Sequence, residues 1–267
     1  MPPPRQLAPL AVAFVLVAAL HAGAEDALPL DAAQIKHRWH ARLDSRHFAA
    51  RIDLEMDLGG LEETRELRVW RDDGGTESER VMVRFESPPD LRSVALLYLE
   101  HGDRPNDYFL YQPSIRRIRR LPETVANDDV YGIDLEFLGF GVAQTEPTRI
   151  ESVSRVTLKG VNTYKLVERA TRSNSRFDRR STWLDPDTFL ALRTEHERAG
   201  RVVMIAQVSE IQSIQGVPTP MAIHFERADA KRSVRLRVRS VDYESAIPET
   251  YFTAMALLGN RLKGESR

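Results

Sequence analysis

Few residues in this chain have the types and spacings that enzymes use for catalysis. Asp134 and Glu136 form a pair of carboxylates, and a glycoside hydrolase needs two such groups at a defined separation. His196 follows Glu195 directly, in a segment that reads as the end of a strand. The chain has no Gly-x-Ser-x-Gly elbow, no His-Glu-x-x-His motif, no glycine-rich phosphate loop and no cysteine nucleophile. We therefore expect a protein that is not an enzyme, with no catalytic residue.

Two histidines are spaced as a pair of metal ligands would be. His37 and His40 lie about one turn apart on a segment with helical periodicity. The sequence places no carboxylate or further histidine where it would complete the ligand set. A solvated helix face explains the pair better, so we expect neither a metal ion nor a cofactor.

The residues Arg116, Arg117, Arg119 and Arg120 form the densest run of charge in the chain. A guanidinium binds phosphate or carboxylate through two parallel hydrogen bonds, so the run suits a lipid head group or an acidic patch on a partner protein. The same arginines could instead coat a strand at a sheet edge and discourage edge-to-edge pairing. The sequence leaves both interpretations open.

A set of large apolar side chains could line a ligand groove or simply form the core. Residues 137–141 combine large apolar groups with glycines, which suits a movable plug over the concave face of a curled sheet. If the plug moves, the space beneath it becomes an apolar pocket. The candidates for lining or closing this groove are Trp70, Phe85, Phe109, Tyr111, Phe137, Leu138 and Phe140.

The elements that must position these residues are mostly strands. Asp31 begins a helix, with Gln34 at capping-box spacing and apolar residues along one face to about residue 46. From residue 52 to residue 58, apolar and acidic residues alternate strictly, which predicts a strand with one buried face. Further strands are predicted at residues 67–71, 80–85, 93–100, 107–112, 149–159, 163–170, 180–184, 191–198, 202–214, 220–227 and 232–241.

Many strands joined by short turns predict a single antiparallel meander. Such a sheet must curl or close to hide its apolar face. The expected fold class is therefore mainly β: a large curled antiparallel sheet forming an incomplete β-barrel, with a few helices covering or plugging the concave face. Residues 122–144 and 248–262 break the strand rhythm and are the candidate caps.

The N-terminus has the pattern of a secretory signal peptide. Arg5 precedes an apolar run at residues 7–20, and Ala22-Gly23-Ala24 follows as a small-residue cleavage site. The run is shorter than the roughly 20 apolar residues that span a bilayer. We expect cleavage after Ala24, so that residues 25–267 form one mature domain, and we expect this domain in a bacterial periplasm.

Composition excludes several classes of protein. The chain contains no cysteine, so it forms no disulfide and has no acylated cysteine as a membrane anchor. The formal net charge of -1 gives no global electrostatic reason to bind nucleic acid.

The order of several motifs resembles that of the periplasmic outer-membrane lipoprotein-sorting protein family, relatives of the lipoprotein carrier and receptor. The resemblance spans most of the mature chain. One departure is that Ile133 stands where members of this family tend to carry serine, between Gly132 and Asp134. The segments that carry the resemblance are the signal peptide, residues 80–89 ending in Ser-Pro-Pro-Asp, Tyr-Phe-Leu-Tyr-Gln-Pro at 108–113, residues 115–121, the acidic-aromatic residues 128–140, and Ile-Pro-Glu-Thr-Tyr-Phe-Thr at 247–253.

The resemblance implies a half-barrel whose concave side shelters acyl chains, with helices as a lid. It also implies work beside an inner-membrane lipid exporter of the resistance-nodulation-division type. The leading hypothesis is a periplasmic carrier that binds a lipid or the acyl chains of a lipoprotein and shuttles it between membranes, with transient membrane contact. The alternatives are a non-enzymatic adaptor that docks on the exporter through the arginine run, and a hydrolase that uses Asp134 and Glu136.

Overall fold

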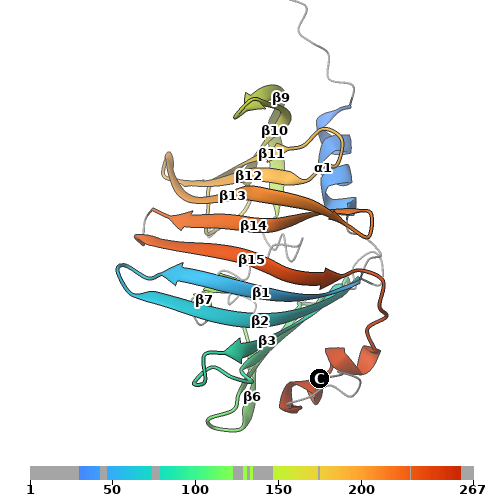
Figure 1. The fold of residues 1–267 in the computed structure, drawn as a ribbon. Helices are drawn as coiled ribbons and strands as arrows, with labels where there is room; N and C mark the ends of the chain where they lie inside the picture. The colour runs from blue at the N-terminus through green and yellow to red at the C-terminus, as the bar shows by residue number, and fades with distance from the viewer. Residues whose placement is uncertain are drawn as a thin grey trace, which may run out of the picture.

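The computed structural model describes residues 30–42, 47–73, 79–122, 129–130, 133–134, 147–173, 175–228 and 230–259. In these ranges the protein has one antiparallel sheet of 13 strands, a two-stranded sheet, one α-helix and two 3-10 helices (Figure 1). The large sheet contains β1 (Phe48–Asp57), β2 (Glu62–Asp73), β3 (Glu79–Ser87), β4 (Ala95–Leu99), β5 (Asp107–Gln112), β6 (Arg117–Leu121), β9 (Thr148–Leu158), β10 (Val161–Ala170), β11 (Arg179–Leu184), β12 (Ala191–Arg198), β13 (Arg201–Ile214), β14 (Val217–Arg227) and β15 (Arg232–Asp242), while β7 (Asp129–Val130) pairs with β8 (Ile133–Asp134).

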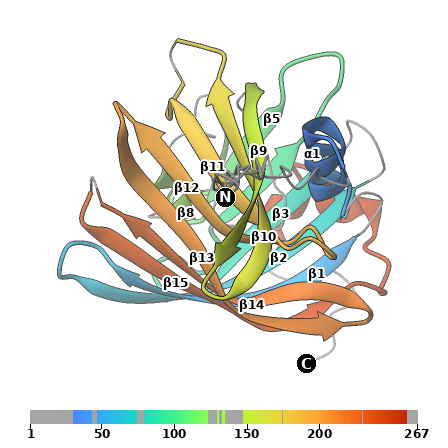
Figure 2. The same cartoon turned by 90° about the horizontal axis from the view of Figure 1, so that it is seen from above.

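The sheet is built from two meanders that meet at its centre. The strands β1 to β6 follow one another outward on one side, and β15 back to β9 follow on the other, because the first strand pairs with the last. The mainly β, antiparallel fold class is thereby confirmed. The described structure differs in two respects from the expected curled, incomplete barrel with a few helices. The edge strands β6 and β9 do not pair with each other, so the sheet is neither closed nor strongly curled, and the described ranges contain a single α-helix (Figure 2).

The helix α1 (Ala32–Ala41) begins as the sequence predicts. Asp31 is its N-cap: the backbone N–H of Gln34 donates to the Asp31 carboxylate over 2.8 Å, and the Gln34 side chain accepts from the backbone N–H of Asp31 over 3.0 Å. The helix ends earlier than the periodicity indicated. Its buried residue, Ile35, packs with Tyr164 and Leu166 of β10 at one end of the sheet.

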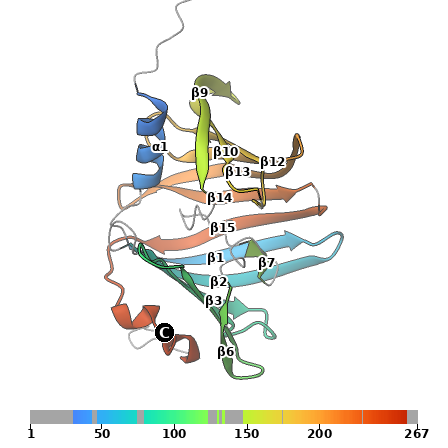
Figure 3. The same ribbon diagram turned by 180° about the vertical axis from the view of Figure 1, so that it is seen from behind.

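Strand pairing defines two faces of the sheet, since directly opposite residues project to the same side. The residues that α1 covers lie on the same side as the central apolar cluster, and we call this side the α1 face. The pairings that connect the two regions run from Leu166 through Thr182, Thr194, Ala206, Phe225 and Val234 to Met56. Figure 3 looks onto this face, with α1 at one end and β7 in front of β1 and β2.

The opposite side of β2 to β5 carries a second apolar cluster, and we call it the C-terminal face. Its strand residues include Trp70, Met82 and Leu97, which are covered by η3 (Glu249–Phe252) and η4 (Ala256–Leu258). The buried Arg84 fixes this cover, because its Nη2 donates to the backbone oxygen of Ala256 over 2.8 Å. The expectation that residues 248–262 cap one side of the sheet is thus confirmed for the part that the structure describes.

No helix within the described ranges has both the length and the apolar character to cross a membrane.

Candidate hydrophobic binding site

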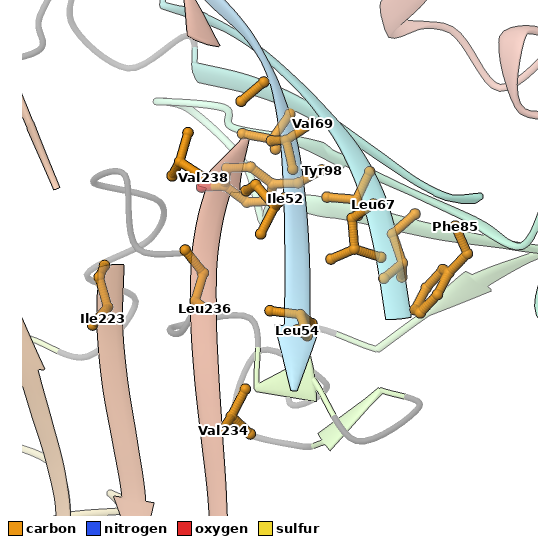
Figure 4. Close-up of a cluster of buried hydrophobic side chains, with 14 of the residues drawn as sticks. Ile52, Leu54, Leu67, Val69, Phe85, Tyr98, Ile223, Val234, Leu236 and Val238 are labelled. Atoms are coloured by element: carbon orange, nitrogen blue, oxygen red, sulfur yellow. The ribbon is translucent and has the colours of Figure 1, made fainter. Parts of the chain in front are cut away.

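The largest apolar cluster in the part of the chain that the structure describes lies on the central part of the α1 face. Period-two alternation sends every second residue of each strand to this side, so adjacent strands form a continuous hydrocarbon layer. Leu54 of β1, Leu67 of β2 and Leu236 of β15 are each at most 1% exposed. Figure 4 shows these side chains beside Val69, Phe85 and Ile223 in one cluster. These side chains are buried in the structure as described.

Phe85 is the predicted groove residue that belongs to this surface. It lies opposite Leu67 in the β2–β3 pairing and is 1% exposed. On β3, the side chains of Val81, Val83 and Phe85 project to the α1 face. Phe85 is thus a member of the buried apolar cluster on the α1 face.

The other described aromatic candidates lie on the C-terminal face. Successive strand pairings connect Trp70 to Met82, then to Leu97 and then to Phe109. Tyr111 joins the same cluster, and the Trp70 ring meets Tyr251 edge-on with 6.0 Å between centroids. A groove on one face of the sheet can therefore include Phe85 or the set of Trp70, Phe109 and Tyr111, but not all four.

The predicted plug lies outside the described residues. This holds for Phe137, Leu138 and Phe140, and also for Glu136 of the carboxylate pair. Asp134 belongs to β8, of which the structure describes the backbone.

The arginine run is divided between the two faces by the alternation of β6. Arg117 lies opposite Gln112 and Arg119 lies opposite Leu110, which places both on the α1 face. Arg120 lies opposite Phe109 on the C-terminal face, and its Nη2 is 2.5 Å from Oδ1 of Asp107. Arg116 occupies the preceding turn with a φ of 50°. β6 is an edge strand, so Arg117 and Arg119 are exposed at an open edge of the sheet, whereas Arg120 is paired with Asp107.

The carboxylate of Asp107 accepts hydrogen bonds from three side chains at this edge. Besides Arg120, it accepts from Arg104 at 3.0 Å and from Nε2 of His101 at 2.9 Å. Burial opposes ionisation of the carboxyl, but hydrogen bonds from Arg104, His101 and Arg120 outweigh it and hold the pKa of Asp107 below its ordinary value.

Replacing this carboxylate should weaken the fold in a pH-dependent way. A group whose pKa is lowered in the folded state stabilises the fold above its unfolded pKa, and this contribution is lost as the pH falls through the folded pKa. We expect Asp107→Asn to lower the free energy of unfolding at pH 7 by about 1 kcal/mol, a small value because the arginine partners are half exposed. Urea titrations at pH 7 and pH 3 test this, and a difference that grows at pH 3 would contradict it.

A second charged cluster, which the sequence analysis missed, fixes α1 to the sheet. Glu168 of β10 is fully buried, and its oxygens lie 2.7 Å from Lys36 Nζ and 2.6 Å from Arg180 Nη2. The hydroxyl of Thr148 donates to the same carboxylate over 2.7 Å, and Arg180 stacks on the ring of Trp39 at 5.1 Å. Burial raises the pKa of Glu168, but Arg180, Lys36 and Thr148 outweigh it and lower the pKa to about 2. The signal for this site was a carboxylate at an inward position of a strand, two residues after Leu166.

No three His, Asp or Glu side chains gather in a metal-binding arrangement within the parts of the chain that the structure describes.

Comparison with known proteins gives one family and several structural relatives. A protein-family model described as "Uncharacterized protein" matches residues 77–258. No curated protein matches the chain.

Three solved structures share the fold at low sequence identity. An outer membrane lipoprotein-sorting protein domain from Vibrio parahaemolyticus aligns with a TM-score of 0.77 and 17% identity, over 86% of this chain and 100% of that one. A DUF1329 family protein from Desulfovibrio piger aligns with a TM-score of 0.75 and 17% identity, over 85% and 97%. A LolA superfamily protein from Nitrosomonas europaea aligns with a TM-score of 0.63 and 16% identity, over 85% and 99%. The chain therefore belongs to the family whose model covers residues 77–258, and its fold is that of the outer membrane lipoprotein-sorting and LolA superfamily domains.

Proposed function

We propose that this protein is a carrier of a hydrophobic molecule, a lipid or the acyl chains of a lipoprotein, that works in the bacterial periplasm. The observation that carries the proposal is the continuous apolar α1 face, built from the strands on both sides of the β1–β15 pairing. Two of its structural relatives bear names that refer to lipoprotein sorting or to the LolA superfamily. In this proposal the open sheet holds the ligand against its α1 face.

The physical need for such a surface is simple. An acyl chain in water is unfavourable by about 0.8 kcal/mol for each CH₂ group, so a chain that crosses an aqueous compartment must travel on a dry surface. The α1 face offers leucine, valine, isoleucine and phenylalanine side chains for this contact. The arginines on the edge strand β6 would meet the donor or acceptor membrane, or an inner-membrane exporter.

The test is the lipid content of the purified protein. Full-length protein should be expressed for export in a bacterium, purified without detergent and analysed by native mass spectrometry followed by lipid extraction. A stoichiometric lipid or acylated peptide is the expected result. A protein that is empty and also takes up no fluorescent fatty acid would overturn the proposal in favour of an adaptor that binds other proteins through Arg117 and Arg119.

The predicted plug gives a further test. We expect Phe137→Asp to abolish co-purifying lipid while the far-UV circular dichroism stays that of the wild type, because a charge in an acyl-binding groove is strongly unfavourable. Lipid extraction from the variant measures this, and an unchanged lipid content would refute the plug assignment.

A further inference from the structure

Arg65 is a buried cation at the end of the apolar α1 face. It lies opposite Leu54 in the β1–β2 pairing and two residues before Leu67, so strand alternation directs it to the same side as these two leucines. Its side chain is 7% exposed. A guanidinium stays protonated in proteins, so burial cannot be relieved by loss of the proton.

The hydrogen bonds of this guanidinium are incomplete. Its Nη2 donates to Oε2 of Glu63 over 2.5 Å, whereas Nε and Nη1 are buried and have no hydrogen-bond partner in the structure as described. An unmade hydrogen bond from a buried charged group is costly, and native proteins satisfy nearly all such groups. Nε and Nη1 are therefore the two nitrogens of Arg65 that could hydrogen-bond a further acceptor.

Arg71, on the same strand and the same face, differs from Arg65 in its carboxylate partners. Its Nε bonds to Glu79 and its Nη2 lies 3.0 Å from Asp73, so two carboxylates surround one guanidinium. Leu67 and Val69 separate the two arginines along β2. The strand thus presents an apolar stretch with a satisfied arginine at one end and an unsatisfied one at the other.

We infer that Arg65 binds the anionic head group of an amphiphile, a carboxylate or a phosphate, whose hydrocarbon chain lies on the α1 face. The inference rests on the proposed carrier function and deepens it by naming the ligand class. The three unused N–H donors on Nε and Nη1 match the oxygens of one oxyanion, and the adjacent Leu54 and Leu67 contact the first part of the chain.

The test compares ligands that differ in the head group alone. We expect wild-type protein to bind dodecanoate and dodecyl phosphate about ten- to hundredfold more tightly than dodecanol, the range that charge-assisted hydrogen bonds give. Arg65→Met keeps the length and apolar packing of the side chain, and it should bring the dissociation constants for dodecanoate and dodecanol together. Arg65→Lys keeps the charge without the fork and should give an intermediate ratio. Acetate should not compete at concentrations where dodecanoate does.

The matched control is Arg235→Met. Arg235 is half exposed, pairs with Glu55 on the other side of the sheet, and should leave the ratio unchanged. Unfolding in urea gives a second readout, since replacing an unsatisfied buried cation should leave ligand-free protein as stable as the wild type or more so. A ratio that Arg65→Met and Arg65→Lys leave unchanged would overturn the inference while the carrier function stands, as would tight binding of acetate alone. Failure of the wild type to bind dodecanol, dodecyl phosphate or dodecanoate would overturn both.

Discussion

Glu168→Gln should destabilise the fold by about 3–5 kcal/mol, because it leaves two cations without their carboxylate in a buried site. Glutamine has the shape of glutamate, so the change isolates the loss of charge. Lys36 and Arg180 would face each other across a neutral amide, whose NH₂ group would meet donors where it needs acceptors. Urea unfolding at pH 7 measures the effect as a lower midpoint.

The pH dependence of this loss follows from the direction of the pKa shift. The pKa of Glu168 falls from 4.5 to about 2 on folding, so its contribution is fully present above pH 4.5 and declines as the pH falls toward 2. The difference in unfolding free energy between wild type and Glu168→Gln should therefore be constant from pH 6 to pH 8 and should shrink below pH 4.5.

Glu151→Gln is the matched control for this substitution. Glu151 lies on the neighbouring strand β9. It also forms ion pairs with two arginines, Arg169 and Arg179, but it is exposed to solvent. Solvent and salt screen such pairs, so its replacement should have a much smaller effect. Equal losses for the two variants would show that burial does not strengthen the Glu168 cluster.

The local elements of this fold could be predicted because their signals lie within a few residues. The capping box at Asp31 and Gln34 identified the start of α1, and the alternation at residues 52–58 identified β1 with its buried side. The short turns between strands indicated an antiparallel meander. Each of these features depends on side-chain periodicity or on one hydrogen bond between near neighbours.

The relative placement of neighbouring strands could not be predicted, because the sequence of a single strand does not specify its pairing register. Alternation shows that Trp70 and Val69 point to opposite sides, but it does not show on which side Phe85 of the next strand lies. A shift of one residue in the pairing would reverse that answer, and the β2–β3 ladder contains an irregularity between Glu66 and Leu67. The predicted groove residues were for this reason distributed over two faces.

Charged residues at inward positions were missed for a related reason. Glu168 follows Leu166 at an inward position of β10, and Arg65 lies at the end of the apolar stretch of β2, where the sequence analysis did not expect buried charges. Arg180 lies on the next strand, β11, but Lys36 comes from α1, far away in the chain, so only the folded structure shows that all three side chains meet. In such proteins, an ionisable residue at a strand position that alternation predicts to be buried should be examined first as a candidate site residue.

Phe85→Ala and Met82→Ala should separate the binding role of the α1 face from its structural role. The two residues lie three positions apart in β3, are both essentially inaccessible, and point to opposite faces of the sheet. Each truncation leaves a cavity in a closely packed cluster and should lower the unfolding free energy by about 2–5 kcal/mol. Urea titration measures this common effect.

Affinity for an acyl ligand should distinguish the two variants. If the proposed ligand binds at the α1 face and packs against Phe85, Phe85→Ala should raise the dissociation constant for dodecanoate about tenfold or more, because apolar contact area is lost. Met82 packs beneath η3 and η4 with Trp70, and its truncation should leave the dissociation constant near that of the wild type. The reverse result, with weaker binding in Met82→Ala alone, would move the ligand to the C-terminal face and make Trp70, Phe109 and Tyr111 its contacts. Because both variants lose stability to a similar degree, a difference in affinity between them reports which face binds the chain and not how well the protein folds.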